Sequence, residues 1–89
     1  MAGGGTTTLA SGQHFPNSIA VDTTSVYWSA LGSEVQNYTD GAITKVPFGG
    51  GPTTVIAANR VQPSAVVLDA TSVYWIEGVT GNIMRATPK

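Results

Sequence analysis

The sequence has no cysteine, and charged residues make up only 10% of its 89 positions. The absence of cysteine excludes disulfides, thiolate metal sites and cysteine nucleophiles. The four cations are scattered and the formal net charge is −1, which argues against a nucleic-acid partner, because phosphate recognition needs clustered lysine and arginine. The sequence shows neither an apolar run long enough for a bilayer nor a signal peptide at its start. We therefore expect a soluble chain with no membrane partner and no targeting signal, and its compartment stays open.

The residues that are present favour β-structure. Hydrophobic residues make up 42% of the chain, and 11 of its residues are glycine. Residues that favour helices are few, whereas threonine, valine and glycine recur in the pattern of short strands and tight turns. The composition predicts an all-β fold.

An internal repeat is the strongest pattern in the sequence. A shift of 47 residues aligns residues 3–30 with residues 50–77, and 12 of these 28 aligned pairs are identical. The identical positions include the pairs Gly3 and Gly50, Gly4 and Gly51, Pro16 and Pro63, Asp22 and Asp69, and the run Thr24–Trp28 with Thr71–Trp75. Such self-similarity is the signature of repeat architectures.

The two copies differ in length after the tryptophans. There the shift falls to 40 residues and aligns Gly41–Lys45 with Gly81–Arg85. The first copy therefore carries about seven additional residues within Leu31–Asp40. Because this insertion separates two strand-like runs, we expect it to be a loop.

Each repeat has the pattern of four short strands, A to D, separated by turn residues. In chain order the predicted strands are D (6–11), A (17–21), B (25–29), C (42–47), D (53–58), A (64–68), B (72–77) and C (82–87). The order D-A-B-C-D-A-B-C gives one complete unit (16–58), flanked by an orphan strand D and by an incomplete unit of strands A to C (63–88). Four antiparallel strands per repeat of 40 to 47 residues are typical of β-propeller blades, so residues 1–89 are predicted to form a two-blade propeller fragment.

The repeat resembles known propeller repeats. Its motif is a proline before an apolar strand that ends in aspartate, then Val-Tyr-Trp, then Gly-Xaa-Ile-Xaa-Lys/Arg, then Gly-Gly. This pattern is similar to the YWTD and NHL repeats, and most of all to the Val-Tyr-Trp repeats found in tandem in bacterial propeller proteins. The resemblance implies a propeller, commonly of six blades.

Two isolated blades would leave two apolar faces bare, which favours association. We expect the C-terminal strands A to C of one chain to take the N-terminal strand D of the next, in a head-to-tail contact that closes a ring. A six-bladed ring needs three copies, so a homotrimer is predicted, with a homotetramer of eight blades as the alternative.

Several residues are predicted to serve this structure. Asp22 and Asp69 are expected to bond the amides of their own turns rather than act in catalysis. The aromatic residues of the repeat are expected to pack between blades, although a tryptophan can also stack on a sugar. These residues are Tyr27, Trp28, Tyr74 and Trp75, and the seam between chains is expected to involve Thr7, Leu9 and Ile83.

A second set of residues is a candidate ligand site. The D-A and B-C connections emerge on one side of a propeller, and in this chain they carry His14, Phe15, Glu34, Tyr38 and Arg60. His14 is the only histidine, and it could act as a metal ligand or as an acid-base group. The alternative is a solvated or capping side chain. The leading prediction is a non-enzymatic self-assembling module, natural fragment or engineered, without cofactor, metal or catalytic residues. The alternatives are a lectin-like propeller that binds a small ligand or glycan and, third, a propeller hydrolase or lyase.

Overall fold

The computed structural model describes residues 5–89, and in that range it contains seven β-strands and no helix. The prediction of an all-β chain is thereby confirmed. The strands are β1 (Pro16–Val21), β2 (Ser25–Ala30), β3 (Gly41–Pro47), β4 (Thr54–Arg60), β5 (Pro63–Leu68), β6 (Val73–Glu77) and β7 (Asn82–Ala86). Each boundary lies within two residues of the range expected from the sequence. Gly3 and Gly4, which the repeat aligns with Gly50 and Gly51, lie outside the described residues.

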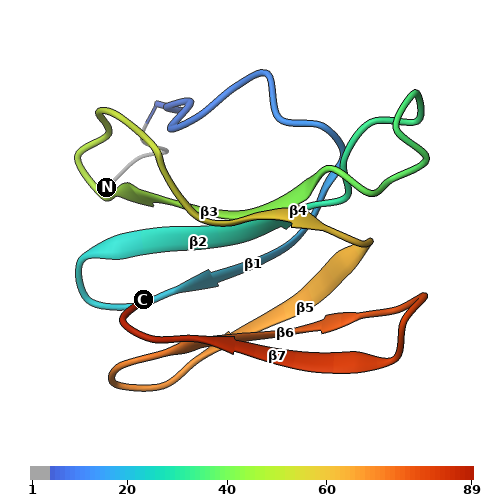
Figure 1. The fold of residues 1–89 in the computed structure, drawn as a ribbon. Coiled ribbons are helices and arrows are strands. Elements are labelled where there is room, and N and C mark those ends of the chain that lie inside the picture. The colour runs from blue at the N-terminus through green and yellow to red at the C-terminus, as the bar shows by residue number, and fades with distance from the viewer. Residues whose placement is uncertain (1–4) are drawn as a thin grey trace.

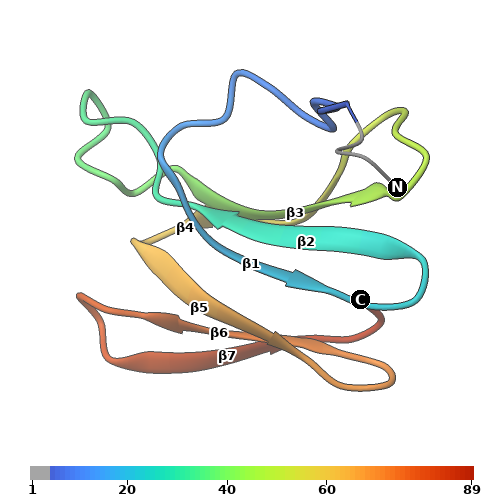
Figure 2. The same cartoon turned by 180° about the vertical axis from the view of Figure 1, so that it is seen from behind.

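The strands form two antiparallel sheets. The first sheet has the order β1-β2-β3-β4 and the second has the order β5-β6-β7. Figure 1 shows them as two layers, with the second sheet on one side of the first and the segment before β1 on the other side. The view from behind confirms this arrangement (Figure 2). No helix in the described part of the chain is able to cross a membrane.

The main apolar core lies between the two sheets. It consists of five buried side chains, Tyr27, Ile43, Val66, Val73 and Trp75. Two of them come from the first sheet and three from the second, so the core holds the layers together. Burying each such side chain contributes about 1.5–3 kcal/mol relative to leaving it in water, so this core stabilises the packing of the two sheets.

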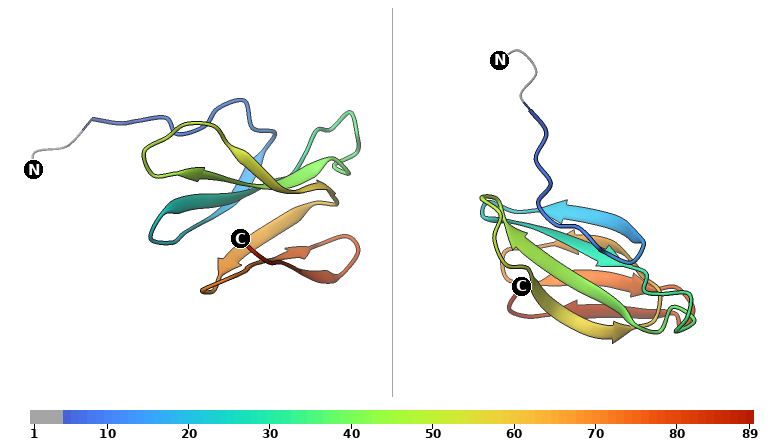
Figure 3. Two further views of the ribbon diagram at one scale, coloured as in Figure 1. Left: turned by 60° about the vertical axis from the view of Figure 1, so that its left-hand side comes forward. Right: turned by 90° about the horizontal axis from the view of Figure 1, so that it is seen from above.

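The chain passes from the first sheet to the second through a short link between β4 and β5. This link crosses from the outer edge of the first sheet to a strand that lies against β1 and β2 (Figure 3). Two hydrogen bonds connect the neighbouring edge strands. Asn17 Nδ2 donates to the carbonyl of Pro63 at 3.2 Å, and the amide of Val66 donates to Ser18 Oγ at 2.8 Å. The edge strand β1 of the first sheet is thus fixed to β5.

Residues 6–11, the predicted orphan strand D, have no regular secondary structure in the single chain. Residues 5–8 are exposed, whereas Leu9 and Ala10 are partly buried against the first sheet. A strand needs a neighbouring strand for its backbone hydrogen bonds, and the neighbour expected for this segment belongs to another chain. The assignment of residues 6–11 to a strand of a composite blade therefore stays a prediction.

The insertion between β2 and β3 forms a loop. Residues 31–40 contain turns and no strand. The carboxylate of Asp40 organises this loop, since it accepts hydrogen bonds from the amide of Ser33 at 2.7 Å and from its hydroxyl at 2.9 Å. Gly32 lies in the left-handed region with φ at 102°, and a Cβ there would lie 2.5 Å from Asp40 Oδ1. The loop therefore requires glycine at position 32.

Candidate functional site

Each sheet has two apolar faces, and they are best named by the aromatic residue of the repeat that each carries. Neighbouring residues of a strand point to opposite sides, so the Tyr-Trp pair puts tyrosine on one face and tryptophan on the other. We call these the Tyr face and the Trp face of a sheet. In the first sheet, the Tyr face carries Tyr27 and Ile43, and the Trp face carries Val26, Trp28 and Val46.

The core between the layers joins unlike faces of the two repeats. The first sheet contributes its Tyr face, through Tyr27 and Ile43. The second sheet contributes its Trp face, through Val66, Val73 and Trp75. One Trp face and one Tyr face are consequently not used by this core.

The unused Trp face of the first sheet borders a groove of about 540 Å³. Its floor is formed by Val26, Trp28 and Val46, and the partly buried Leu9 and Ala10 lie along its side. Most of the lining is apolar. Figure 2 shows the segment before β1 running over this side of the sheet, away from β5 to β7.

The unused Tyr face of the second sheet is open to solvent. Val67 is 59% exposed, and Ile83, on the outer strand β7, is 75% exposed. The equivalent residues of the first repeat are Ala20 and Ile43, which pack into the core, and Ile43 is fully buried. The same positions are therefore core in one repeat and surface in the other.

Residues 12–15, which lead into β1, and residues 59–62, which end β4 and lead into β5, share two positions with positive φ. Gly12 (φ 72°) corresponds to Asn59 (56°), and Phe15 (56°) corresponds to Gln62 (47°). Non-glycine residues seldom adopt this conformation, so its recurrence at matched positions marks a common path of the chain.

Contacts on both sides of these links repeat as well. The carbonyl of Phe15 accepts a hydrogen bond from Leu31 N at 2.9 Å, and the carbonyl of Gln62 accepts one from Gly78 N at 3.4 Å. The segments before the two links, residues 9–10 and residues 56–57, also pack in a similar way.

Leu9 and Ala10 contact the Trp face of the first sheet, just as Ile56 and Ala57 contact the core that includes the Trp face of the second sheet. Residues 9–15 thus follow the path that β4 and its link follow in the next repeat. The difference is that β4 has a neighbouring strand, whereas residues 6–11 have none among residues 5–89.

The turn between β1 and β2 is built on one aspartate. Asp22 Oδ1 accepts hydrogen bonds from the amides of Thr24 and Ser25, both at 2.8 Å. Its Oδ2 accepts one from the hydroxyl of Tyr27 at 3.1 Å and lies 3.0 Å from the ammonium of Lys89. One carboxylate therefore closes the turn and anchors the tyrosine.

The turn between β5 and β6 repeats this arrangement. Asp69 Oδ1 accepts hydrogen bonds from the amides of Thr71 at 2.9 Å and Ser72 at 2.7 Å, and its Oδ2 accepts one from the hydroxyl of Tyr74 at 2.6 Å. The two aspartates therefore have a structural role in turns that the repeat copies.

These contacts lower the pKa of both carboxyl groups. The amide of Thr24 has the largest effect on the pKa of Asp22, and the ammonium of Lys89 adds to it. The hydroxyl of Tyr74 has the largest effect on the pKa of Asp69. In the unfolded chain an aspartate has a pKa of about 3.9. The ionised carboxylates therefore stabilise the fold above about pH 4, and this contribution is lost as the pH falls toward the lower folded-state values.

Asp22→Asn is expected to lower the free energy of unfolding by about 1 kcal/mol at neutral pH, because asparagine has no charge for Lys89 and its amide nitrogen accepts no hydrogen bond from Tyr27. The difference between parent and variant should shrink as the pH falls below about 5, because the unfolded parent then takes up a proton at Asp22 that the folded parent, with its lowered pKa, does not. Urea unfolding followed by tryptophan fluorescence at a series of pH values measures both. Stability curves that run parallel over this range would contradict the assigned role of Asp22.

The structure brings only some of the predicted ligand-site residues together. Phe15 and Tyr38 contact each other edge to face, with ring centroids 6.1 Å apart. The carbonyl of His14, on the same link as Phe15, accepts a hydrogen bond from Gly32 N at 3.1 Å, while Glu34 is exposed in the insertion loop. Of the predicted ligand-site residues on this side of the molecule, Phe15 and Tyr38 thus form an aromatic contact.

Arg60 forms an ion pair with the buried side chain of Glu77. Its Nε lies 3.2 Å from Oε2 of Glu77, in ion-pair range but outside hydrogen-bond geometry. Glu77 is 2% exposed and also accepts a hydrogen bond from Trp75 Nε1 at 3.1 Å. In the first repeat, the indole of Trp28 donates instead to Oε1 of Gln13 at 3.1 Å. Both indoles are thus buried with a polar partner.

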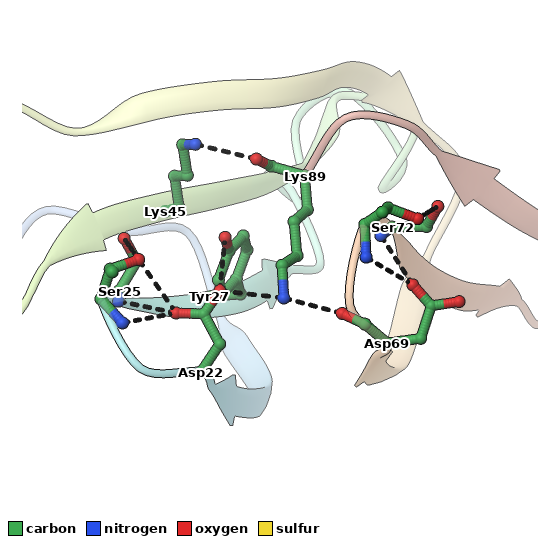
Figure 4. Close-up of polar contacts among 9 residues, drawn as sticks. Asp22, Ser25, Tyr27, Lys45, Asp69, Ser72 and Lys89 are labelled. Atoms are coloured by element: carbon green, nitrogen blue, oxygen red, sulfur yellow. Dashed lines mark hydrogen bonds and ion pairs between the residues drawn. The ribbon is translucent and has the colours of Figure 1, made fainter.

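Sequence reasoning missed the role of Lys89. Its ammonium lies 3.0 Å from Asp22 Oδ2 and donates to the carbonyl of Asp69 at 2.7 Å, so it connects the turns of both sheets (Figure 4). Lys45 Nζ donates to the main-chain oxygen of Lys89 at 3.0 Å and lies 6.0 Å from the ring centroid of Tyr27. No local pattern indicated this contact, because its partners are far apart in the sequence.

Residues 5–89 contain no group of three or more histidine, cysteine, aspartate or glutamate side chains placed to hold a metal ion. Comparison of the chain with protein-family models, with curated proteins and with solved structures found no match.

Proposed function

We propose that this chain is a two-blade unit of a β-propeller and that its function is to build a closed ring with further copies of itself. In this proposal each sheet is a blade, and the proposed activity is assembly rather than catalysis. The observation that carries it is the pairing of unlike faces in the core of the single chain.

The faces left uncovered by this core are complementary. Within the chain, a Tyr face packs on a Trp face, and what stays open is a Trp face on the first sheet and a Tyr face on the second. A second copy offers the matching face to each of them. A contact between different surfaces of identical chains is head-to-tail, so successive copies repeat the same rotation; such a series either closes or grows as a filament, and in this proposal it closes into a ring.

The N-terminal segment supports an exchange of strands at this contact. Residues 9–15 follow the path that β4 and its link take in the other repeat. In the second sheet, β7 is an edge strand without the fourth partner that β4 gives to the first sheet. In the proposed ring, residues 6–11 of one copy lie along β7 of its neighbour and supply that strand, which covers an open sheet edge.

In the proposed ring, the groove of about 540 Å³ is part of the surface that the preceding copy covers. It lies between the N-terminal segment and the Trp face of the first sheet, where strands A to C of the preceding copy would pack. The apolar floor of Val26, Trp28 and Val46 matches the Val67 and Ile83 side chains that such a copy brings. Covering both surfaces removes large apolar patches from water.

The number of copies follows from the family resemblance of the repeat, which implies six blades. Six blades correspond to a homotrimer of two-blade chains, and eight blades in a homotetramer are the alternative. Native mass spectrometry and light scattering of the purified chain test the proposal. We expect a particle of about three times the 9.1 kDa chain mass, and a fourfold mass would indicate the tetramer. A well-folded protein with the mass of one chain at the highest attainable concentration would overturn it.

A further inference from the structure

An ion pair between Lys89 and Asp22, which we call the latch, joins the two sheets within the chain. Lys89 follows β7, and its amide donates to the carbonyl of Thr71 at 3.0 Å. From there its side chain reaches the first sheet, where the ammonium lies 3.0 Å from Asp22 Oδ2. Both side chains are only 16% exposed, so the pair is shielded from water on most sides. Figure 4 shows Lys89 between the two aspartate turns.

The first repeat has a different residue at the position of this latch. The amide of Phe48 donates to the carbonyl of Thr24 at 3.1 Å, and Thr24 is the repeat equivalent of Thr71. In the alignment of the repeats Phe48 matches Pro88, which has no amide hydrogen, so the equivalent hydrogen bond is made one residue later, by Lys89. By this backbone contact, Phe48 takes the place that Lys89 has in the second repeat. Phe48 is 49% exposed in the single chain. In the proposed ring this position faces the Asp69 turn of the preceding copy.

The side-chain hydrogen bonds between the inner edge strands are also fewer at the contact between copies than within the chain. Asn17 and Ser18 make the two side-chain hydrogen bonds from β1 to β5. Their repeat equivalents are Ser64 and Ala65. Alanine has no acceptor for an amide, and serine is shorter than asparagine. A contact between copies that repeats the internal geometry therefore lacks at least one of these hydrogen bonds.

On the basis of the proposed function, we infer that the ring has two chemically different seams, and that the seam between copies is apolar and unlatched because Phe48 replaces Lys89 there. The Asp69 turn already holds the ammonium of Lys89 from its own chain, on the Asp69 carbonyl, but at that seam its carboxylate receives no cation from the neighbouring copy. It is already held in place by Tyr74, Thr71 and Ser72. The partner surface is a second copy of this chain, and the ring is expected to dissociate into intact chains rather than within them.

Supplying the missing cation tests the inference. Phe48→Lys, Phe48→Met and Phe48→Glu place a positive, a neutral and a negative side chain of similar length opposite Asp69. The dissociation constant between copies, measured by sedimentation equilibrium at low salt, should be about twofold to fivefold lower for lysine than for methionine and higher for glutamate. High salt should reduce these differences, since it screens exposed charges. Circular dichroism verifies that each variant is folded.

Asp69→Asn is the matched control. In that background the three side chains at position 48 should no longer differ in the order lysine, methionine, glutamate. If the parent chain assembles but the order at position 48 is absent or does not depend on Asp69, the inference about the seam is wrong and the proposed ring stands. If the parent chain has the mass of a single chain, both are overturned.

Discussion

Ile83→Arg is expected to give a folded chain that no longer assembles. Ile83 is 75% exposed on the Tyr face of the second sheet, so the single chain loses little packing when it is replaced. In the proposed ring, the Trp face of the next copy covers this residue. Burying an isoleucine contributes about 1.5–3 kcal/mol, and an unpaired buried charge costs several kcal/mol. The dissociation constant should therefore rise by more than about a hundredfold.

The measurement is the particle mass at matched concentrations, with circular dichroism as the test of folding. Val35→Arg is the control, because Val35 lies in the 31–40 loop, is 90% exposed and belongs to neither face. This variant should assemble as the parent does. Assembly of Ile83→Arg with the parent's affinity would show that the Tyr face of the second sheet is not the surface between copies.

Ile43→Ala is expected to destabilise the single chain by about 2–5 kcal/mol, since it leaves a cavity in the core between the sheets. Ile43 is the repeat equivalent of Ile83, but it is fully buried. A loss of this size approaches the whole stability of a small domain. Urea unfolding followed by tryptophan fluorescence, at a concentration low enough for single chains to prevail, measures the effect.

Ile83→Ala is the matched substitution for this experiment. Under the same dilute conditions it should change the free energy of unfolding by less than about 0.5 kcal/mol, because the side chain has few neighbours within the chain. At concentrations that favour assembly, it should become destabilising, since association stabilises the folded state. Equal losses for Ile43→Ala and Ile83→Ala in dilute solution would contradict the burial that distinguishes the two repeats.

The strands and turns were predictable because their causes are local. Asp22 and Asp69 accept hydrogen bonds from amides two and three residues ahead, so the turn chemistry is contained in a few consecutive residues. The strand ranges follow from apolar runs bounded by such turns. The position of the insertion loop at residues 31–40 followed from comparing the two copies of the repeat.

The sequence did not indicate which faces are covered. All six residues of β2 are buried, and the apolar run Val26–Trp28 within it does not alternate, so it carries no information about which side faces inward. Ile43 and Ile83 both lie two residues after a glycine and two before a basic residue, yet one is fully buried and the other is 75% exposed. Burial here depends on whether another sheet is present, which a local pattern does not record.

By itself, then, the sequence determined the all-β class, the repeat, seven of the eight predicted strand ranges and the aspartate turns, because each arises from short-range hydrogen bonding and residue preference. Tertiary structure decided the partners of the long-range contacts, such as Lys89 with Asp22, Arg60 with Glu77 and Phe15 with Tyr38. It also decided which Tyr face and which Trp face meet. These contacts join residues distant in the chain, so their geometry exists only once the two sheets have packed.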